Sequence, residues 1–518
     1  MRDRATEIMQ LRSTCFDLLI VGGGVHGAAI ACEAARSGAR VAMIDRGDFA
    51  SGASSNSLKI LHGGFRYLRQ LDFARMRTSI RCRREWAQLA PDLVRPLPCA
   101  IATTGYGPRN SLPFAAALAA NDIISADRNR GLSGTQRIPR GRLLRPAQYE
   151  AVARDLLGPV HSAGALWWDA VALETEALVI GLMERATAAG ACSANYVGAR
   201  ELLMGSKGVH GVGAWDMESG ETFEIRAAQT ICAVGAGENV LTAEIDRHAG
   251  ISRPACWAMN VVLKDRPVAE VAIAVSLPTE RDRESASPSR HLFFVPWRNR
   301  TMIGTHYLAC DDSRNEADQR HRAVSELLDL AHSAAPASRF GESDICFVHW
   351  GKLALSRPWC GNEPAPLLAS PRLCDYGRVA SRAGLWSIEG PKFTSALDVA
   401  RQTVQRVLGT RCGSMRTEGA DPTRRANRVV GADPEASGAD AARYLAARKL
   451  EDTVLRRNGL GSAGHPGVAA LEACARGMGR ILGWDPARTR SEVQGLSEFY
   501  RERHSCTRNK QPLQQEAP

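Results

Sequence analysis

The stretch from Phe16 to Asp45, FDLLIVGGGVHGAAIACEAARSGARVAMID, constrains the fold of this chain more than any other. Its apolar run Leu18–Val21 predicts a strand buried on both faces of a parallel sheet. The alanine-rich segment from Val25 to about Ser37 predicts a helix that packs closely on that sheet, and Val41–Ile44 predicts a second buried strand. The sequence therefore predicts a doubly wound α/β domain that begins with this strand–helix–strand unit.

Three glycines, Gly22, Gly24 and Gly27, follow the G-x-G-x-x-G spacing between the first strand and the helix. They permit a tight turn, the approach of a pyrophosphate to the backbone, and close packing of the helix, respectively. Asp45 stands at the end of the second strand, about 20 residues beyond the glycines, where a carboxylate binds a ribose hydroxyl. The pattern predicts a dinucleotide without a ribose 2′-phosphate, with its pyrophosphate at the helix N-terminus.

Composition narrows the class of protein. The 518 residues are enough for two or three domains, and no run of about 18 apolar residues could span a bilayer. The 14 cysteines are scattered without a C-x-x-C pair, which predicts free thiols in the cytoplasm and neither disulfides nor a metal site. The formal net charge is +11, but the basic residues are spread along the chain without a nucleic-acid-binding module, so we expect no nucleic-acid partner.

A loop rich in small and hydroxyl residues follows Asp45 and leads into Leu58–Leu68, LKILHGGFRYL. Together they resemble the S-S-x-S-x-K-x-x-H-G-G-x-R-Y-L signature of FAD-dependent glycerol-3-phosphate dehydrogenases, a family of quinone-reducing flavoenzymes. The resemblance recurs from about Phe16 to about Tyr500. It implies FAD as cofactor, an FAD-binding doubly wound (Rossmann-like) α/β domain, a mixed-sheet substrate domain and a small helical C-terminal domain.

The resemblance also implies domain boundaries. The FAD-dependent oxidoreductase region would span residues 16–408, with FAD-binding segments at about 16–90, 165–250 and 340–408 and substrate-domain segments between them. A composition rich in Arg, Gly, Pro and Asp predicts a linker over 409–440. Helical periodicity predicts a helical C-terminal domain over 441–505.

The residues that match the family's FAD contacts carry hydroxyl, basic or backbone donor groups. They are Ser54, Ser55, Ser57, Lys59, His62, Val197, Gly235, Gly390, Lys392 and Thr394, in addition to Gly22, Gly24, Gly27 and Asp45. Hydroxyls and loop N–H groups can satisfy a pyrophosphate without a metal ion. The helix that follows Lys392 can stabilise negative charge on a reduced flavin through its N-terminal N–H groups.

A flavin that oxidises an alcohol accepts a hydride, so the protein must supply a base, a substrate-binding group and positive charge. His62 is the candidate base, and His306 is a second candidate. The resemblance places Arg66 and Tyr67 towards the substrate and Lys392 near the flavin. An isolated histidine more often has a structural role, but the motif around His62 favours a position at the flavin.

Two positions depart from the family pattern and bear on the substrate. Leu353 stands where members that handle glycerol 3-phosphate carry an arginine in G-x-R-P-L, and Trp257 stands where they carry a lysine or arginine. The loss of two cations would weaken phosphate binding by several kcal/mol, at about 1.5–3 kcal/mol each. We therefore expect dehydrogenation of a secondary alcohol on a small polyol, polyol phosphate or hydroxy acid, with weak or no turnover of glycerol 3-phosphate.

Other functions remain open at this point. An FAD-dependent amine or imino-acid oxidase is the main rival enzyme, and a flavin-bound scaffold without activity is an alternative of another class. An NAD-dependent dehydrogenase is disfavoured because the serine-rich loop and H-G-G-x-R-Y have no role in it. In the main hypothesis a quinone or another acceptor takes the electrons, and both a homodimer and a peripheral contact with the inner face of the membrane stay open.

Overall fold

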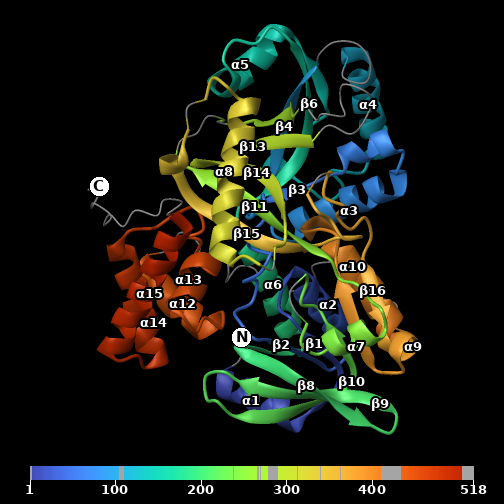
Figure 1. The fold of residues 1–518 in the computed structure, drawn as a ribbon, viewed down its shortest axis with the longest axis vertical. Helices are drawn as coiled ribbons and strands as arrows, with labels where there is room; N and C mark the ends of the chain where they lie inside the picture. Colours follow the sequence, from blue (N-terminus) through green and yellow to red (C-terminus); the bar gives the residue numbers. More distant parts are fainter. Residues whose placement is uncertain are drawn as a thin grey trace.

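Two β-sheets with surrounding helices and a separate group of C-terminal helices make up the protein in this computed structural model (Figure 1). The structure describes residues 3–103, 110–236, 239–264, 268, 270–277, 290–311, 313–338, 340–361, 363–409 and 433–504. The fold class expected from the sequence is confirmed, with an FAD-binding α/β domain, a mixed-sheet domain and a helical C-terminal domain.

Strand β1 (Cys15–Val21) lies in the interior of the first sheet, as its apolar sequence predicts. It pairs in parallel with β2 (Val41–Asp45) on one side and with β10 (Thr222–Cys232) on the other. The order is β16–β17–β10–β1–β2–β7. The outer strands are β16 (Arg372–Asp375), β17 (Leu385–Glu389) and β7 (Cys192–Asn195), of which β16 is antiparallel to its neighbour.

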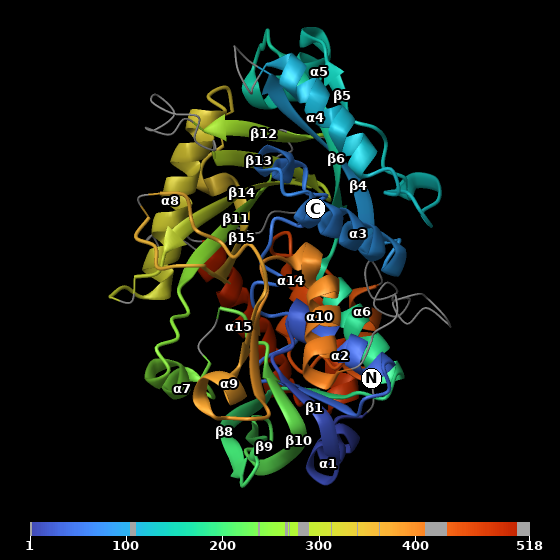
Figure 2. The ribbon, with the colours of Figure 1, turned by 90° about the vertical axis from the view of Figure 1, so that its right-hand side faces the viewer.

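Helices cover one face of this sheet and a hairpin with short helices covers the other (Figures 1 and 2). The first face carries α2 (Val25–Arg36), α6 (Thr175–Ala188) and α10 (Ala396–Leu408). The second carries β8 (Val197–Gly205), β9 (Gly208–Asp216), α1 (Arg4–Ser13), α7 (Ala243–His248) and α9 (Tyr376–Ala380). Both faces of β1 are therefore covered, which is why its sequence does not alternate between apolar and polar residues.

The second sheet is mixed and has the order β15–β11–β14–β13–β12–β4–β6–β3, with β5 paired to β6. Its strands are β3 (Ile60–Leu61), β4 (Val94–Thr103), β5 (Arg142–Leu144), β6 (Ala163–Ala172), β11 (Ala255–Leu263), β12 (Ala272–Leu277), β13 (Arg290–Trp297), β14 (Arg300–Ala309) and β15 (Ile345–Ala354). Helix α8 (Glu316–Ala334) packs on its outer face, and α5 (Pro146–Leu157) lies at one end. Near β4 and β6 lie α3 (Phe73–Leu89) and α4 (Ser111–Ile124).

Strand β15 corrects one expected boundary. The segment from about residue 340 was expected to belong to the FAD-binding sheet, but β15 pairs with β11 in the second sheet. Strand β6, most of which falls in the expected segment of 165–250, also lies in the second sheet. A short apolar strand has the same pattern in either sheet, so its pairing partner cannot be predicted from periodicity.

The C-terminal helices form a compact group that contacts β15. They are α12 (Pro434–Tyr444), α13 (Leu450–Arg456), α14 (Val468–Leu482) and α15 (Pro486–His504). Helix α12 begins before the expected boundary at 441, because Asp433 accepts hydrogen bonds from the N–H groups of Glu435 and Ala436 and Pro434 occupies the first helical position. Residues 410–432 of the expected linker lie outside the described residues.

Candidate active site

The glycine turn between β1 and α2 leaves no room for side chains. Gly22 has a φ of 114°, in the left-handed region that favours glycine. A Cβ at Gly27 would lie 1.9 Å from the carbonyl oxygen of Gly22, so the helix can pack on the turn only with glycine at this position. Gly24 is the N-cap of α2, and Ser54 Oγ accepts a hydrogen bond from Val25 N (2.9 Å) at the same helix terminus.

The carboxylate of Asp45 lies against this turn. Its Oδ2 accepts a hydrogen bond from Gly23 N (2.6 Å) and its Oδ1 accepts one from Gly47 N (2.8 Å). Burial raises the pKa of Asp45 in spite of these two bonds. A carboxylate has about four acceptor positions, so a ribose hydroxyl could still bind here.

Lys59 forms a buried ion pair, which differs from the FAD contact expected for it. Its Nζ donates to Glu176 Oε1 (2.6 Å), Thr175 Oγ1 (2.9 Å) and the carbonyl oxygen of Ser55 (2.8 Å). An ammonium group has three hydrogens, and these bonds use them all. Lys59 therefore holds the serine-rich loop on the N-terminus of α6.

The other two serines of this loop bond to its own backbone. Ser55 Oγ donates to the carbonyl oxygen of Gly52 (3.1 Å), and Ser57 Oγ accepts from Lys59 N (3.3 Å). Of the three serines expected at the FAD, Ser54 is the one that the structure places at the N-terminus of α2.

His62 is paired with a buried carboxylate. Its Nδ1 lies 3.2 Å from Asp169 Oδ2, and its backbone N–H donates to Thr394 Oγ1 (3.2 Å). Asp169 also accepts hydrogen bonds from Gly63 N (2.5 Å) and Arg83 Nη1 (3.3 Å). Burial alone would raise the pKa of Asp169, but the hydrogen bond from His62 and the nearby positive charges lower it to about 2.

The pair of His62 and Asp169 can fix which ring nitrogen of the histidine carries the proton. An ionised Asp169 accepts from Nδ1–H of His62, which leaves Nε2 of the neutral imidazole as the acceptor. The His62 side chain is 44% exposed, whereas that of Asp169 is 5% exposed, so a small molecule can reach the histidine but not the carboxylate.

Arg66, Tyr67 and Lys392 form one cluster around the Tyr67 ring. Lys392 Nζ donates to the Tyr67 hydroxyl (3.1 Å) and to Ser79 Oγ (2.8 Å). The Arg66 guanidinium lies 5.2 Å from the Tyr67 ring centroid, and its Nη2 is 3.5 Å from the hydroxyl. The structure thus brings together three of the predicted site residues, with two positive charges at one phenol.

His306 and Trp257, both predicted for the site, lie on the other face of the second sheet. His306 is buried, and its Nε2 lies 3.0 Å from Glu326 Oε2 of α8. Trp257 stacks on Trp350 and donates from Nε1 to Gln319 Oε1 (3.0 Å) of α8. The structure therefore does not bring these two residues to His62, because successive residues of a strand point to opposite faces and the sequence did not show which face was which.

Cys256 occupies the face on which Trp257 was expected. It is buried and directly opposite Leu353 in the β11–β15 ladder. Leu353 shares a face with Gly351, where an added Cβ would lie 3.1 Å from Cα of Ala53 in the serine-rich loop. Leu353 therefore lies on the side of the sheet that faces the first domain, and the residue beside it is also uncharged.

The remaining predicted residues lie next to the ends of strands or at a helix N-terminus. Gly390 follows β17, and a Cβ there would lie 1.8 Å from His26 Nε2 of α2. Thr394 is buried before α10, next to the backbone of His62. Val197 begins β8 and is buried, and Gly235 has a φ of 67° just after β10.

Comparison with known proteins assigns this chain to a family. The family model described as "FAD dependent oxidoreductase" matches residues 17–406. The chain belongs to the FAD-dependent oxidoreductase family.

Two curated relatives have related names. The "Glycerol-3-phosphate dehydrogenase" of Synechocystis sp. is 26% identical over 416 residues, which cover 77% of this chain and 71% of the relative. The "Glycerol-3-phosphate dehydrogenase" of Mycobacterium leprae is 31% identical over 403 residues, which cover 76% of this chain and 63% of the relative. The match thus spans between 63% and 71% of the length of these relatives.

Solved structures of low sequence identity share the fold. The glycerol-3-phosphate dehydrogenase of Bacillus halodurans, complexed with FAD, has a TM-score of 0.67 at 18% identity and covers 98% of this chain and 99% of its own. A glycine oxidase from Geobacillus kaustophilus has a TM-score of 0.51 at 20% identity and covers 79% of this chain and 100% of its own. Members of this fold thus include proteins named for alcohol and for amine substrates.

The residues of this family member fit an FAD. The glycine turn leaves a backbone surface for the pyrophosphate, and Asp45 keeps acceptor capacity for a ribose hydroxyl. Lys392 supplies a positive charge beside the turn before α10. Among the described residues no cluster of histidine, cysteine or acidic side chains could hold a metal ion.

Sequence reasoning missed Asp169 and Arg83 of this FAD-dependent oxidoreductase. Asp169 is an acidic residue inside the apolar run ALWWDAVAL, and such a residue in a buried strand needs a partner. Arg83 lies on α3 among several other arginines, but it is buried, and a Cβ added at Gly63 would lie 2.3 Å from its Nη1. The lone acid in the strand was a usable signal, whereas nothing in the helix pattern distinguished Arg83 from its exposed neighbours.

The phenol of Tyr67 gives the site a testable pH dependence. Burial would raise the pKa of Tyr67, but the charges of Lys392 and Arg66 lower it to about 8. Because the folded pKa is below the ordinary value of about 10, the contribution of this group to stability is full above pH 10 and is lost as pH falls through about 8. We expect a tyrosinate absorbance transition near pH 8 that disappears in Tyr67→Phe and moves to higher pH in Lys392→Met. A wild-type protein with no tyrosine titrating below about pH 10 would contradict this assignment.

Proposed function

We propose that this protein is an FAD-dependent dehydrogenase that oxidises a secondary alcohol of a small polyol, polyol phosphate or hydroxy acid. The observation that supports it is the pair of His62 and buried Asp169, because His62 lies in the same segment as Arg66 and Tyr67 of the cationic cluster. The curated relatives named glycerol-3-phosphate dehydrogenase favour an alcohol over an amine as the substrate class.

Each side chain has a defined task in this proposal. FAD, when bound, accepts the hydride from the carbinol carbon. His62 Nε2 accepts the hydroxyl proton, and Asp169 stabilises the imidazolium that results. Arg66 and Lys392 both lie at the Tyr67 hydroxyl, so their positive charges are concentrated in one place. Together they attract an electron-rich or acidic group of the substrate.

Glycerol 3-phosphate itself is expected to be a poor substrate. Leu353 and its cross-strand neighbour Cys256 carry no charge, and Trp257 faces α8, so this part of the sheet offers no cation from these three residues. A phosphate dianion is best bound by several charge-assisted hydrogen bonds. Only Arg66 and Lys392 of the proposed substrate groups can supply them.

The direct test is anaerobic reduction of the bound flavin. Glycerol 3-phosphate, unphosphorylated polyols and 2-hydroxy acids are each mixed with the enzyme without oxygen, and loss of the oxidised flavin absorbance is followed. Bleaching by one of the last two groups and not by glycerol 3-phosphate is expected. Bleaching by glycerol 3-phosphate within the usual KM range of about 1 μM–1 mM would show that other cations compensate. Bleaching by none would overturn the proposal.

Substitution of Leu353 tests the substrate assignment further. Leu353→Arg should lower the Kd for glycerol 3-phosphate at least about tenfold, because one charge-assisted hydrogen bond is worth about 1.5–3 kcal/mol. Leu202→Arg changes a half-buried leucine of the β8–β9 hairpin and is the matched control. Equal effects of the two variants on binding would place Leu353 outside the substrate site.

Other functions would give different outcomes. An amine or imino-acid oxidase would release peroxide under oxygen with an amine substrate, and a scaffold would keep its flavin oxidised with every compound tested.

The proposed electron acceptor is a quinone or another oxidant, and a peripheral membrane contact and a homodimer are part of the same proposal. No helix among residues that the structure describes is long and apolar enough to cross a membrane.

A further inference from the structure

The loop that follows Asp45 fixes the glycine turn from two sides. Gly23 N donates to Asp45 Oδ2 (2.6 Å), and the carbonyl oxygen of Gly23 accepts from Ala50 N (3.0 Å). The Phe49 ring packs so closely that a Cβ at Gly23 would lie 2.4 Å from Phe49 Cδ1. A shift of residues 45–50 would therefore move both the turn and the carboxylate that form the dinucleotide site.

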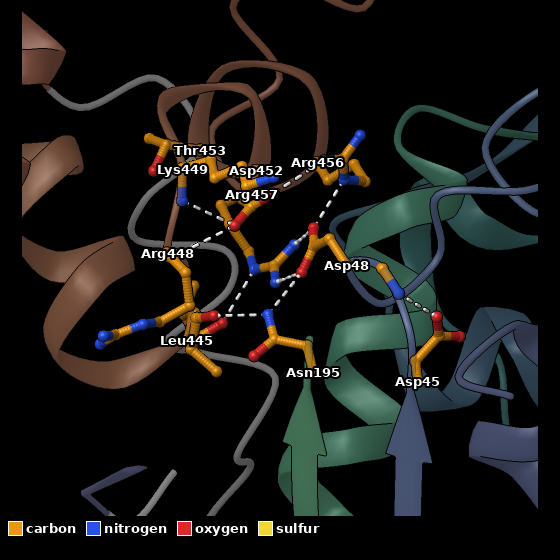
Figure 3. Close-up of polar contacts among 12 residues, drawn as sticks. Asp45, Asp48, Asn195, Leu445, Arg448, Lys449, Asp452, Thr453, Arg456 and Arg457 are labelled. Carbon is orange, nitrogen blue, oxygen red and sulfur yellow. Dashed lines mark hydrogen bonds and ion pairs between the residues drawn. The ribbon is translucent and has the colours of Figure 1, made fainter. Parts of the chain in front are cut away.

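Asp48, in the middle of this loop, is held by the C-terminal helices (Figure 3). Arg457 donates from Nη2 to Asp48 Oδ1 (2.7 Å) and from Nη1 to Oδ2 (2.9 Å), and Arg456 Nε donates to Oδ2 (2.6 Å). All three side chains are buried. Burial would raise the pKa of Asp48, but the two guanidinium charges lower it to about 2, so the carboxylate is ionised at neutral pH.

The strand end next to Asp45 joins the same network. Asn195 ends β7 opposite Asp45, and its Nδ2 donates to Asp48 Oδ1 (2.9 Å) and to the carbonyl oxygen of Ala446 (2.8 Å). Tyr196 N donates to the carbonyl oxygen of Gly47 (3.0 Å), and its hydroxyl donates to Asp452 Oδ1 (2.6 Å). The C-terminal helices thus bond to both segments that border the adenosine end of the proposed FAD site.

We propose that Asp48, Arg456 and Arg457 are positioning residues for FAD, through which the helical unit of residues 433–504 holds the loop after Asp45 in its binding conformation. Asp48 accepts four hydrogen bonds, two at each oxygen of its carboxylate. The loop therefore has one well-defined position when the helices are docked. Coupling between two binding events is reciprocal, so FAD must also stabilise the docked helices.

The first test measures FAD binding to the full-length apoprotein. Quenching of FAD fluorescence gives the Kd of the wild type, Asp48→Asn and Arg457→Lys. Both variants are expected to raise the Kd, within the range of about 5–150-fold that is usual for coupled sites, and Arg457→Lys should have the smaller effect because the positive charge is kept. Glu218→Gln is the matched control. Glu218 accepts two hydrogen bonds from Arg448 of the same helical unit (2.8 and 2.7 Å) but lies outside the loop after Asp45.

The second test uses the wild type, so it does not depend on a variant that folds. Saturating FAD should slow hydrogen exchange of the backbone amides in residues 445–457, which are not part of the dinucleotide site itself. Asp48→Asn should lose this effect while its other helices stay protected. An unchanged exchange rate in the wild type would overturn the proposal, as would a Glu218→Gln variant that raises the Kd as much as Asp48→Asn. Both readouts are independent of the substrate, so they are unaffected if the proposed dehydrogenase function is wrong.

Discussion

Replacement of His62 by glutamine is expected to lower the rate constant for flavin reduction by the alcohol substrate about 10²–10⁴-fold, the usual contribution of a positioned general base. Glutamine can keep a hydrogen bond to Asp169 but cannot accept a proton at neutral pH. The rate constant is measured at saturating substrate by rapid mixing without oxygen, so a change in substrate binding does not enter the comparison.

His306 offers a matched control for this experiment. Like His62 it has a carboxylate partner, Glu326, but it is buried and faces α8 on the other side of the sheet. His306→Gln should leave the rate constant close to that of the wild type. A His62→Gln enzyme that bleaches as fast as the wild type would remove His62 from the mechanism, and Asp169 would then have only a structural role.

A single added methyl group at Gly27 is expected to abolish FAD binding. In Gly27→Ala the new Cβ would lie 1.9 Å from the carbonyl oxygen of Gly22, and a backbone atom cannot rotate away as a side chain can. Helix α2 would have to move from the turn, and its N-terminus would no longer lie where the pyrophosphate binds. The purified variant should lack the flavin absorbance at about 450 nm even after incubation with excess FAD.

Gly52→Ala separates this effect from the general cost of losing a glycine. Gly52 lies in the serine-rich loop, and a Cβ there would have no atom within 4 Å. This variant should bind FAD like the wild type. Normal flavin content in Gly27→Ala would mean that the turn can open without loss of the site.

Much of the first domain could be predicted from sequence, because its signals are local. The apolar strand β1, the glycine spacing and the acid that ends β2 all lie within 31 consecutive residues of β1 to β2, and the structure has each element where the pattern predicts it. The segment with His62, Arg66 and Tyr67 was recognisable for the same reason. Its partner Lys392 lies more than 300 residues away, and only the resemblance to a family connected the two.

The predicted residues that lie away from His62 are in the second sheet, and their placement has a common physical cause. Strand β11 is buried on both faces, so its sequence does not alternate, and nothing showed that Trp257 faces α8 while Cys256 faces the first domain. In β14 the stretch of residues 301–304 just before His306 is also buried without a break, so the sequence did not show which face His306 occupies. Asp48 was passed over because its partners are 408 and 409 residues away, beyond any local pattern.

The interior position of β1 has a consequence for how the protein is made. Its neighbour β2 is synthesised directly after it, but its other neighbour β10 comes much later in the chain. The delay is about 200 residues, which takes on the order of 10–40 s at a synthesis rate of about 5–20 residues per second. Over that time one edge of an apolar strand has unpaired N–H and C=O groups that can pair with another chain. The position of β1 between β2 and β10 therefore leaves this edge open to pairing between nascent chains until β10 has been made.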